Sequence, residues 1–261
     1  MITDVNVSLS SWPTRRLPLN DTAQVVAELS RLGVTQAWAG TFDAILHNDI
    51  AAANQRLTDE CHSPGAGILL PFGAVNLTLP NWEDDIRRCS EIHGMPGLRL
   101  LPGYHDYLLS DERFVKLLSL ASKMRMIVQI SVRLEDPRTQ HRLLSVQDVD
   151  IQPLLEVLPD FPQVPIVLLN GLSNASTEMH SQLAAAGNVF FDIATLEGLA
   201  GLERQLRMIP AERILYGSHA PFFTPEAAKL KLQESELPVL IIEQITHGNA
   251  AKLLATVRSR V

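Results

Sequence analysis

Short apolar segments alternate with longer amphipathic segments along most of this chain. The short segments are rich in Val, Ile and Leu and predict strands, whereas the longer ones repeat apolar positions at helical spacing. The predicted strands are Ile2–Ser8, Gln36–Gly40, Gly67–Val75, Gly97–Leu101, Met126–Ser131, Val164–Leu169, Val189–Ile193 and Arg213–Tyr216. The predicted helices are Asp21–Leu32, Ala44–Cys61, Trp82–Ile92, Asp111–Met124, Ile151–Leu158, Thr177–Ala186, Leu199–Met208 and Pro225–Glu234, with a last helix around Val239–Val257.

This regular alternation predicts an α/β fold with a parallel sheet. The run Ile166–Leu169 is apolar at every position, as expected of a parallel strand that is covered on both faces. Eight strand–helix units favour a single (β/α)8 TIM barrel that spans residues 1–261 as one domain. An open doubly wound sheet is the main alternative. Such a sheet usually has a glycine-rich loop after its first strand, and Ser8–Ser11 contains no glycine.

Composition narrows the class of partner. The chain has 261 residues, 46% of them hydrophobic, and a formal net charge of −7. The charges are spread along the sequence and form no basic face, so we expect no nucleic-acid partner. No apolar stretch is long enough to cross a membrane, so no membrane partner is expected either. The two cysteines, Cys61 and Cys89, lie far apart, which excludes a disulfide framework and suits a cytoplasmic protein.

Polar side chains gather where the predicted strands end. Barrel enzymes place their chemistry at the carboxyl ends of the strands, so these residues are the candidates for a small-molecule site. Amides and hydroxyls are weak zinc ligands, and the chain has neither His-x-His nor His-Glu-x-x-His. We therefore predict no cofactor, with a divalent metal such as zinc as the weaker alternative. The candidates are Asn6, Ser8, Arg99, Tyr104, His105, Gln129, Arg133, Asn170, Asp192 and His219.

Several of these residues lie in segments that resemble the amidohydrolase-related family of TIM-barrel metal-dependent hydrolases, which also includes decarboxylases and lactonases. DVNVSLSSWP (4–13) is similar to the family's opening Asp-x-His-x-His-Leu segment, and RILYGSHAPF (213–222) to its eighth-strand Gly-Ser-Asp. MPGLRLLPGYHDYLLSD (95–111) resembles its fourth-strand region, PIVLLNG (165–171) its sixth-strand segment, and HGNAAKLL (247–254) its closing helix. The resemblance covers nearly the full length and implies a TIM barrel with its site at the strand ends.

The chain departs from the family at every matched metal-ligand position. Asn6 and Ser8 stand where the family has its two first-strand histidines. Gln129 or a neighbour replaces the fifth-strand histidine, and Asn170 replaces the sixth-strand histidine. His219 replaces the eighth-strand aspartate, which in the family binds metal and accepts a proton from water. Loss of the whole set points to loss of the metal, and a neutral imidazole is then a better proton acceptor near pH 7 than a carboxylate.

Three residues are the candidates for catalysis, each with a structural alternative. His219 would act as general acid or base, or would only fill the former metal site through hydrogen bonds. Asp192 would orient the imidazole, or would cap the turn that follows its strand. Arg99 would bind a substrate carboxylate or a developing oxyanion; otherwise it forms a salt bridge with Asp106, Glu135 or Asp192.

The remaining candidates would contact the substrate. Tyr104 and His105 are expected on a loop after a strand, where they would either touch a ligand or cover the core. Gln129 and Asn170 are expected to form hydrogen bonds in the pocket. Arg133 begins the charged tract 133–141, which is typical of a solvated loop, although Arg133 itself is close enough to a strand end to reach a ligand.

Three functions remain open from the sequence. The first is a metal-independent hydrolase or lyase that acts on a small anionic molecule. The second is a catalytically inactive barrel that binds a small molecule, and the third is a metal-dependent hydrolase with unorthodox ligands such as His219, Asp192 and His105. A homodimer is a further possibility that the sequence does not decide.

Overall fold

The computed structural model of the chain describes residues 1–63 and 66–258. Its strands are β1 Ile2–Leu9, β2 Val34–Thr41, β3 Leu69–Pro71, β4 Gly73–Ala74, β5 Gly97–Leu100, β6 Ile127–Ser131, β7 Ile166–Leu169, β8 Val189–Asp192 and β9 Ile214–Leu215. The α-helices are α1 Thr22–Arg31, α2 Ile50–His62, α3 Trp82–Arg87, α4 Pro102–His105, α5 Glu112–Met124, α6 Leu154–Val157, α7 Thr177–Ala186, α8 Gly201–Leu206, α9 Glu226–Gln233, α10 Val239–Glu243 and α11 Asn249–Arg258.

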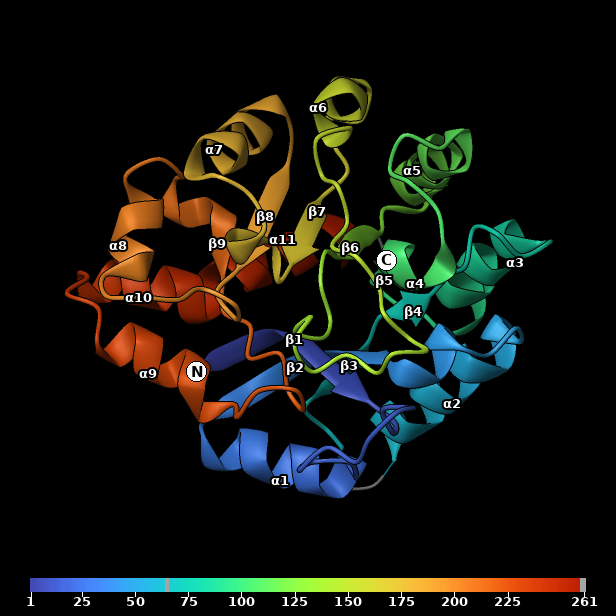
Figure 1. Cartoon of the computed structure of the whole chain (residues 1–261), viewed down its shortest axis with the longest axis horizontal. Helices are drawn as coiled ribbons and strands as arrows, with labels where there is room; N and C mark the ends of the chain where they lie inside the picture. The colour runs from blue at the N-terminus through green and yellow to red at the C-terminus, as the bar shows by residue number, and fades with distance from the viewer. Residues whose placement is uncertain (64–65, 259–261) are drawn as a thin grey trace.

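The strands form a parallel barrel, which confirms the predicted fold class. Hydrogen-bonded pairs run from β1 to β3 and from β4 to β9. Only Phe72 separates β3 from β4, so these two are parts of one barrel strand that changes its partner. The ring closes where the Val5 amide donates to the Tyr216 carbonyl and the Ser8 amide to the Ala220 carbonyl, both at 2.9 Å. Figure 1 looks along this barrel, with helices around the strands and α11 crossing behind its centre.

Buried apolar side chains form two layers around the strands. The larger layer lies between strands and helices and includes Leu98, Leu168 and Phe191. The smaller one fills the interior of the barrel, where Trp38 stacks on Phe72, and the α11 residues Leu253 and Leu254 join it. Strand side chains alternate between these two layers, so apolar residues suit both faces of most strands, with Arg99 and Gln129 as buried polar exceptions.

The sequence misplaced several element boundaries. The predicted helix Ala44–Cys61 begins only at Ile50, because a 3-10 turn at Phe42–Ile45 and a loop come first. The predicted helix Ile151–Leu158 shrinks to α6, and residues 133–153 before it form a long irregular segment. This segment crosses in front of the barrel centre in Figure 1. It therefore covers the end of the barrel where the candidate residues lie.

Candidate functional site

A hydrogen-bonded network joins three of the strand ends. The Asn6 side chain on β1 donates to Asp192 Oδ2 on β8 at 2.7 Å and to Asn170 Oδ1, after β7, at 2.9 Å. The Asn170 backbone amide donates to Asp192 Oδ1 at 2.7 Å. Burial raises the pKa of Asp192 to about 6, while the bonds from Asn6 and Asn170 act in the opposite direction. The network is buried and holds these three side chains in one arrangement.

His219 lies beside this network, on the turn that follows β9. Its backbone has φ of +59°, a left-handed conformation that residues with a Cβ adopt mainly where the surroundings impose it. Nε2 is 2.6 Å from the Leu134 carbonyl oxygen, which only accepts, so Nε2 carries the proton. Nδ1 then accepts from the Asn170 amide at 3.2 Å. Burial lowers the pKa of His219 to about 4, so the ring is neutral at pH 7.

The expected pairing of Asp192 with His219 is wrong in this structure. Both carboxylate oxygens of Asp192 accept from Asn6 and Asn170 instead. Asp192 reaches the imidazole only through Asn170, whose side-chain amide is the group that contacts Nδ1.

Close packing of Gly217 against Asp192 gives a first prediction. A Cβ at position 217 would lie 2.5 Å from Asp192 Oδ2 and 2.9 Å from Asp192 Cβ. We expect Gly217→Ala to lower the free energy of unfolding by about 2 kcal/mol because the carboxylate must move from its amide donors. Urea denaturation measures this loss of unfolding free energy. Gly67→Ala is the control, since no atom lies within 4 Å of a Cβ at residue 67. An equal effect of the two substitutions would contradict the packing described.

Arg99 on β5 crosses the barrel interior and is bound by the protein's own oxygen atoms. Its Nη1 donates to the Val7 carbonyl at 2.5 Å, and its Nη2 donates to the carbonyls of Val5 at 3.2 Å and Trp38 at 2.9 Å. Nε donates to Gln129 Oε1 at 2.8 Å, and the Gln129 amide in turn donates to the Val5 carbonyl. Burial lowers the pKa of Arg99 to about 10, which is still far enough above 7 for the guanidinium to stay charged.

Neither sequence-based interpretation of Arg99 fits these contacts. Its three guanidinium nitrogens already donate to oxygen atoms of the protein, and it forms no salt bridge with Asp106, Glu135 or Asp192 among the described residues. The β1–β2 register is irregular between Asp4 and Val7, so carbonyls of β1 need other donors. Arg99 and Gln129 supply those donors. Gly40 is required beside them, because a Cβ there would lie 2.6 Å from Arg99 Cδ.

The other candidates are divided between the mouth and the core. Ser8 lies within 3.3 Å of Arg99 Nη1. Tyr104 and His105 belong to the short helix α4 rather than a loop, and buried His105 contacts the Ala44 carbonyl through Nε2 at 2.8 Å. His105 is therefore part of the core and not a substrate contact. Arg133 pairs with Asp148.

Asp4 is a site residue that sequence reasoning missed. It is fully buried, and its Oδ1 accepts from the backbone amides of Asn6 at 3.1 Å and Ser218 at 3.0 Å. It thereby ties β1 to the turn that carries His219. Burial raises the pKa of Asp4 to about 6. The available signal was a lone acidic residue at the start of an otherwise uncharged strand, which is costly to bury unless it has a structural partner.

Four aromatic rings cover the mouth of the barrel, another feature that the sequence did not reveal. Trp12 is central, with ring centroids 5.1 Å from Phe42, 5.8 Å from Tyr104 and 4.8 Å from Phe222. Phe222 also stacks on the His219 ring at 5.0 Å. These rings come from segments after four different strands, so only the closed barrel brings them together.

A cavity of about 390 Å³ opens beside His219. This volume suits a small molecule. Its polar lining comes from the segments after β6, β7 and β8 and from the turn after β9. The lining residues are Arg133, Leu134, Asp136, Pro137, Arg138, Ser173, Thr195, Glu197, His219 and Phe223.

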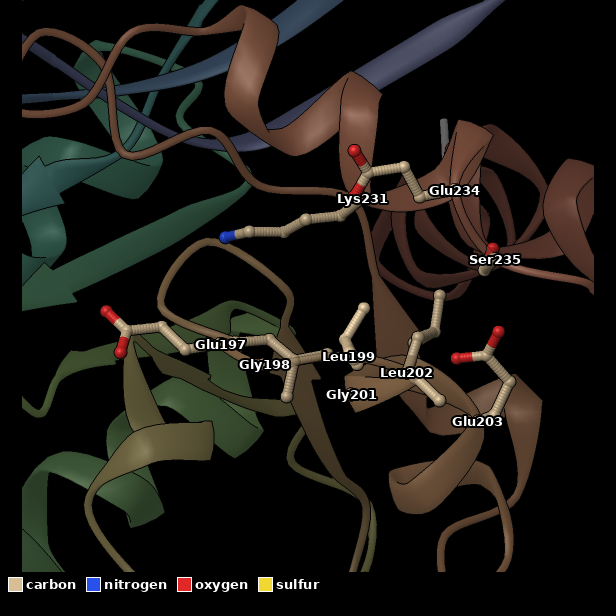
Figure 2. A pocket seen from close by; sticks show the side chains of 11 residues that line it. Glu197, Gly198, Leu199, Gly201, Leu202, Glu203, Lys231, Glu234 and Ser235 are labelled. Carbon is tan, nitrogen blue, oxygen red and sulfur yellow. The ribbon is translucent and has the colours of Figure 1, made fainter.

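A neighbouring cavity of about 310 Å³ lies between α9 and the loop that leads into α8. Figure 2 shows Lys231 extending from α9 into it, with Glu197 on the facing loop. Lys231 Nζ donates to the carbonyls of Ile193 at 3.2 Å and Ala194, just after β8. Burial lowers the pKa of Lys231. Lys231 thus anchors the loop that carries Thr195 and Glu197.

The side chains at the strand ends do not fit a divalent cation. The only carboxylate in the network, Asp192, already accepts from two amides, and both His219 ring nitrogens are engaged. The Arg99 guanidinium adds a fixed positive charge beside Ser8 and Gln129, which repels a second cation. Across residues 1–63 and 66–258, no three His, Cys, Asp or Glu side chains gather as a ligand set, so His219, Asp192 and His105 do not form one.

The fold and the polar mouth define a TIM-barrel protein with a small-molecule cavity at its strand ends. A family model described as Amidohydrolase matches residues 12–256. The chain belongs to the amidohydrolase family. No curated protein matches the sequence. In the described residues, no helix is long and apolar enough to cross a membrane.

Solved structures with the same fold have low sequence identity to this chain. A dihydroxybenzoic acid decarboxylase from Polaromonas sp. JS666, with bound manganese and the inhibitor 2-nitroresorcinol, has a TM-score of 0.75 at 13% identity, covering 99% of this chain and 98% of that one. A 5-carboxyvanillate decarboxylase from Sphingomonas paucimobilis gives 0.73 at 14%, covering 97% and 98%. A 4-oxalomesaconate hydratase from Rhodopseudomonas palustris gives 0.69 at 13%, covering 98% and 96%. At this identity the likeness shows the fold.

Proposed function

We propose that this protein is a metal-independent hydrolase or lyase for a small anionic molecule, with His219 as the residue that handles the proton. The observation that carries the proposal is the neutral, left-handed His219 at the wall of a cavity of about 390 Å³. Membership of a family of TIM-barrel enzymes supports it, because their sites lie at the same strand ends. The solved relatives named above act on small carboxylic acids, which supports a carboxylate as the substrate class.

The hydrogen bonds of His219 suggest how it would act. Its Nε2 already donates to one carbonyl, that of Leu134, and a substrate carbonyl in the cavity would take the same place. A neutral imidazole with a lowered pKa is a weak base but a suitable electrophilic donor to an oxygen that gains negative charge. Asn170 holds the tautomer through Nδ1, and Asn6 and Asp192 position Asn170. Asn170, Asn6 and Asp192 are therefore positioning residues.

Two arginines would bind the anion in a cavity that is also lined by the carboxylates of Asp136 and Glu197. Arg133 pairs with Asp148 and Arg138 with Asp136 through Nε and Nη2 in each case. Neither pair uses Nη1, so each guanidinium keeps a face that can bind a carboxylate. Both arginines line the cavity with His219. The carboxylate would bind there while its reacting group faces the imidazole.

Turnover and binding of small aromatic acids test this proposal. We expect metal-stripped protein to convert a member of a panel that includes 2,6-dihydroxybenzoate and 5-carboxyvanillate. His219→Gln should lower kcat by about 100-fold or more, because one positioned proton donor contributes roughly that factor. Its Kd from calorimetry should change by less than about threefold. His47→Gln, at an exposed histidine, is the matched control.

Three results would contradict the proposal. The first is turnover that appears only with stoichiometric zinc or manganese. The second is an equal loss of binding and turnover in His219→Gln. The third is binding of the acids by wild-type protein with no conversion.

One observation favours a non-catalytic binding barrel as the second candidate. Both His219 ring nitrogens and all three Arg99 nitrogens already have partners within the protein. A site that waits for a substrate usually keeps some donors free. Under this alternative the barrel binds the same small anions, and no variant of His219 changes a rate.

A further inference from the structure

A second cavity at the barrel mouth lies between the segment after β1 and the loop 139–143, and its volume is about 580 Å³. Its charged lining side chains are Arg15 and Arg142, with His141 beside them. No carboxylate is among its described lining residues, although the chain has a net charge of −7. The lining residues are Thr14, Arg15, Thr139, Gln140, His141, Arg142 and Leu143. A concave, basic surface on an acidic protein favours small anions.

One wall of this cavity belongs to the cover of the barrel mouth. We name residues 11–17 the mouth strap. Trp12 of the strap packs among the aromatic rings described above, and Arg15 pairs through Nε with buried Glu135 at 2.9 Å. The Arg15 guanidinium also lies 5.8 Å from the centre of the Phe222 ring. Arg15 therefore fastens the strap to the loop that carries Leu134 and Glu135.

The closed strap leaves polar atoms unsatisfied beneath it. Trp12 Nε1, Tyr104 Oη and Glu135 Oε2 are buried without a hydrogen-bond partner among the described residues. Glu135 is 1% exposed, so Arg15 neutralises a buried carboxylate through Nε, and losing this contact would leave that charge unpaired. Arg15 Nη1 and Nη2 have no hydrogen-bond partner among the described residues, so they are free to bind a second anion.

We propose that this cavity is an oxyanion-binding vestibule in which a carboxylate or phosphate group bridges Arg15 and Arg142 and so ties the mouth strap to the loop 139–143. The anion binds Arg15 through Nη1 and Nη2 while Nε keeps Glu135, and the tightened strap changes the surroundings of Trp12. This inference rests on the proposed function in one respect, since the mouth that the strap covers leads toward His219. The vestibule itself stands on its own residues.

Tryptophan fluorescence tests the vestibule directly. The chain has three tryptophans, and Trp38 and Trp82 lie away from the mouth in the core and at α3. Wild-type protein is titrated with sodium phosphate and, separately, sodium acetate, with sodium chloride holding ionic strength constant. We expect a saturable change with at least one of the two anions that is absent in Trp12→Phe and needs about tenfold more anion in Arg142→Gln. Arg87→Gln, at an exposed arginine on α3, should behave as wild type.

A second variant examines the fastening by Arg15. Arg15→Gln should shift the emission to longer wavelength without any anion, because Trp12 becomes hydrated when the strap opens. The proposal is overturned if neither anion gives a saturable change, or if Arg142→Gln responds as wild type does. It is also overturned if Arg15→Gln leaves the emission unchanged.

His219→Gln separates this inference from the proposed function. It should keep the full fluorescence response, since His219 does not line the vestibule. A fluorescence response that persists while no acid is turned over would contradict the proposed function alone. Turnover that depends on His219 without any fluorescence response would contradict the proposed vestibule alone.

Discussion

Arg99→Met should lower the free energy of unfolding by about 4 kcal/mol, the largest effect that we expect of any single substitution here. Methionine has a comparable length and no donor. The carbonyls of Val5, Val7 and Trp38 would lose a charged partner inside the barrel. Water cannot replace it without opening the strands. Urea denaturation followed by circular dichroism gives the value.

Arg113→Met is the matched control for this substitution. Arg113 pairs with Asp111 at the surface with 43% of its side chain exposed, so its removal should cost less than about 1 kcal/mol. A loss below about 1 kcal/mol for Arg99→Met would show that the guanidinium does not bind the barrel strands together. If Arg99→Met is instead insoluble, Arg99→Lys should fold with an intermediate loss, because lysine keeps the charge but not the fork of donors.

The second large effect that we expect is a loss of stability in acid that depends on His219. Burial lowers the pKa of His219 from 6.5 to about 4 in the folded protein. Between these values the unfolded chain binds a proton at this residue that the folded protein does not bind. Acidification through this range therefore favours the unfolded state, and the free energy of unfolding falls by about 3 kcal/mol through this one group. Below pH 4 both states are protonated and the effect is complete.

A comparison with His219→Gln isolates this contribution. Glutamine does not titrate and keeps an amide that can donate to the Leu134 carbonyl. The difference in unfolding free energy, wild type minus variant, should rise by about 3 kcal/mol from pH 4 to pH 6.5. His47→Gln at the surface should give a constant difference. A flat difference for His219→Gln would mean that the buried imidazole is protonated as readily as a free one.

Two buried carboxylates act in the opposite direction in the wild-type protein. Burial raises the pKa values of Asp4 and Asp192 from 3.8 to about 6. The folded protein holds these protons over a range where the unfolded chain has lost them, so stability falls as pH rises from 3.8 to 6. The contribution of His219 and those of the two carboxylates therefore partly cancel in the pH dependence of wild-type stability. The difference between wild type and variant is the sharper measurement, because neither carboxylate is hydrogen-bonded to His219 and their contributions are the same in both proteins.

The sequence determined the barrel because its pattern is local. Eight apolar segments alternate with amphipathic ones, and the predicted strand Val189–Ile193 and helix Thr177–Ala186 match β8 and α7 within one residue. The period of the apolar positions reflects which face of a segment is buried, and the residues of that segment alone are enough to show it. The predicted bounds of the helices Ala44–Cys61 and Ile151–Leu158 were wrong because irregular turns precede both helices. The conformation of such turns depends on what they pack against.

The sequence singled out Asn6, Asn170, Asp192 and His219 as polar positions at strand ends, and the structure brings them together, but the sequence did not reveal Asp4. It did not predict the partners of these side chains. Asp192 binds Asn6 and Asn170 rather than His219, and Arg99 binds carbonyls of β1 that an irregular register leaves free. Those pairings join positions 22 to 186 residues apart. No local pattern encodes them, because they depend on which strand lies beside which once the barrel closes, so only the tertiary structure decided them.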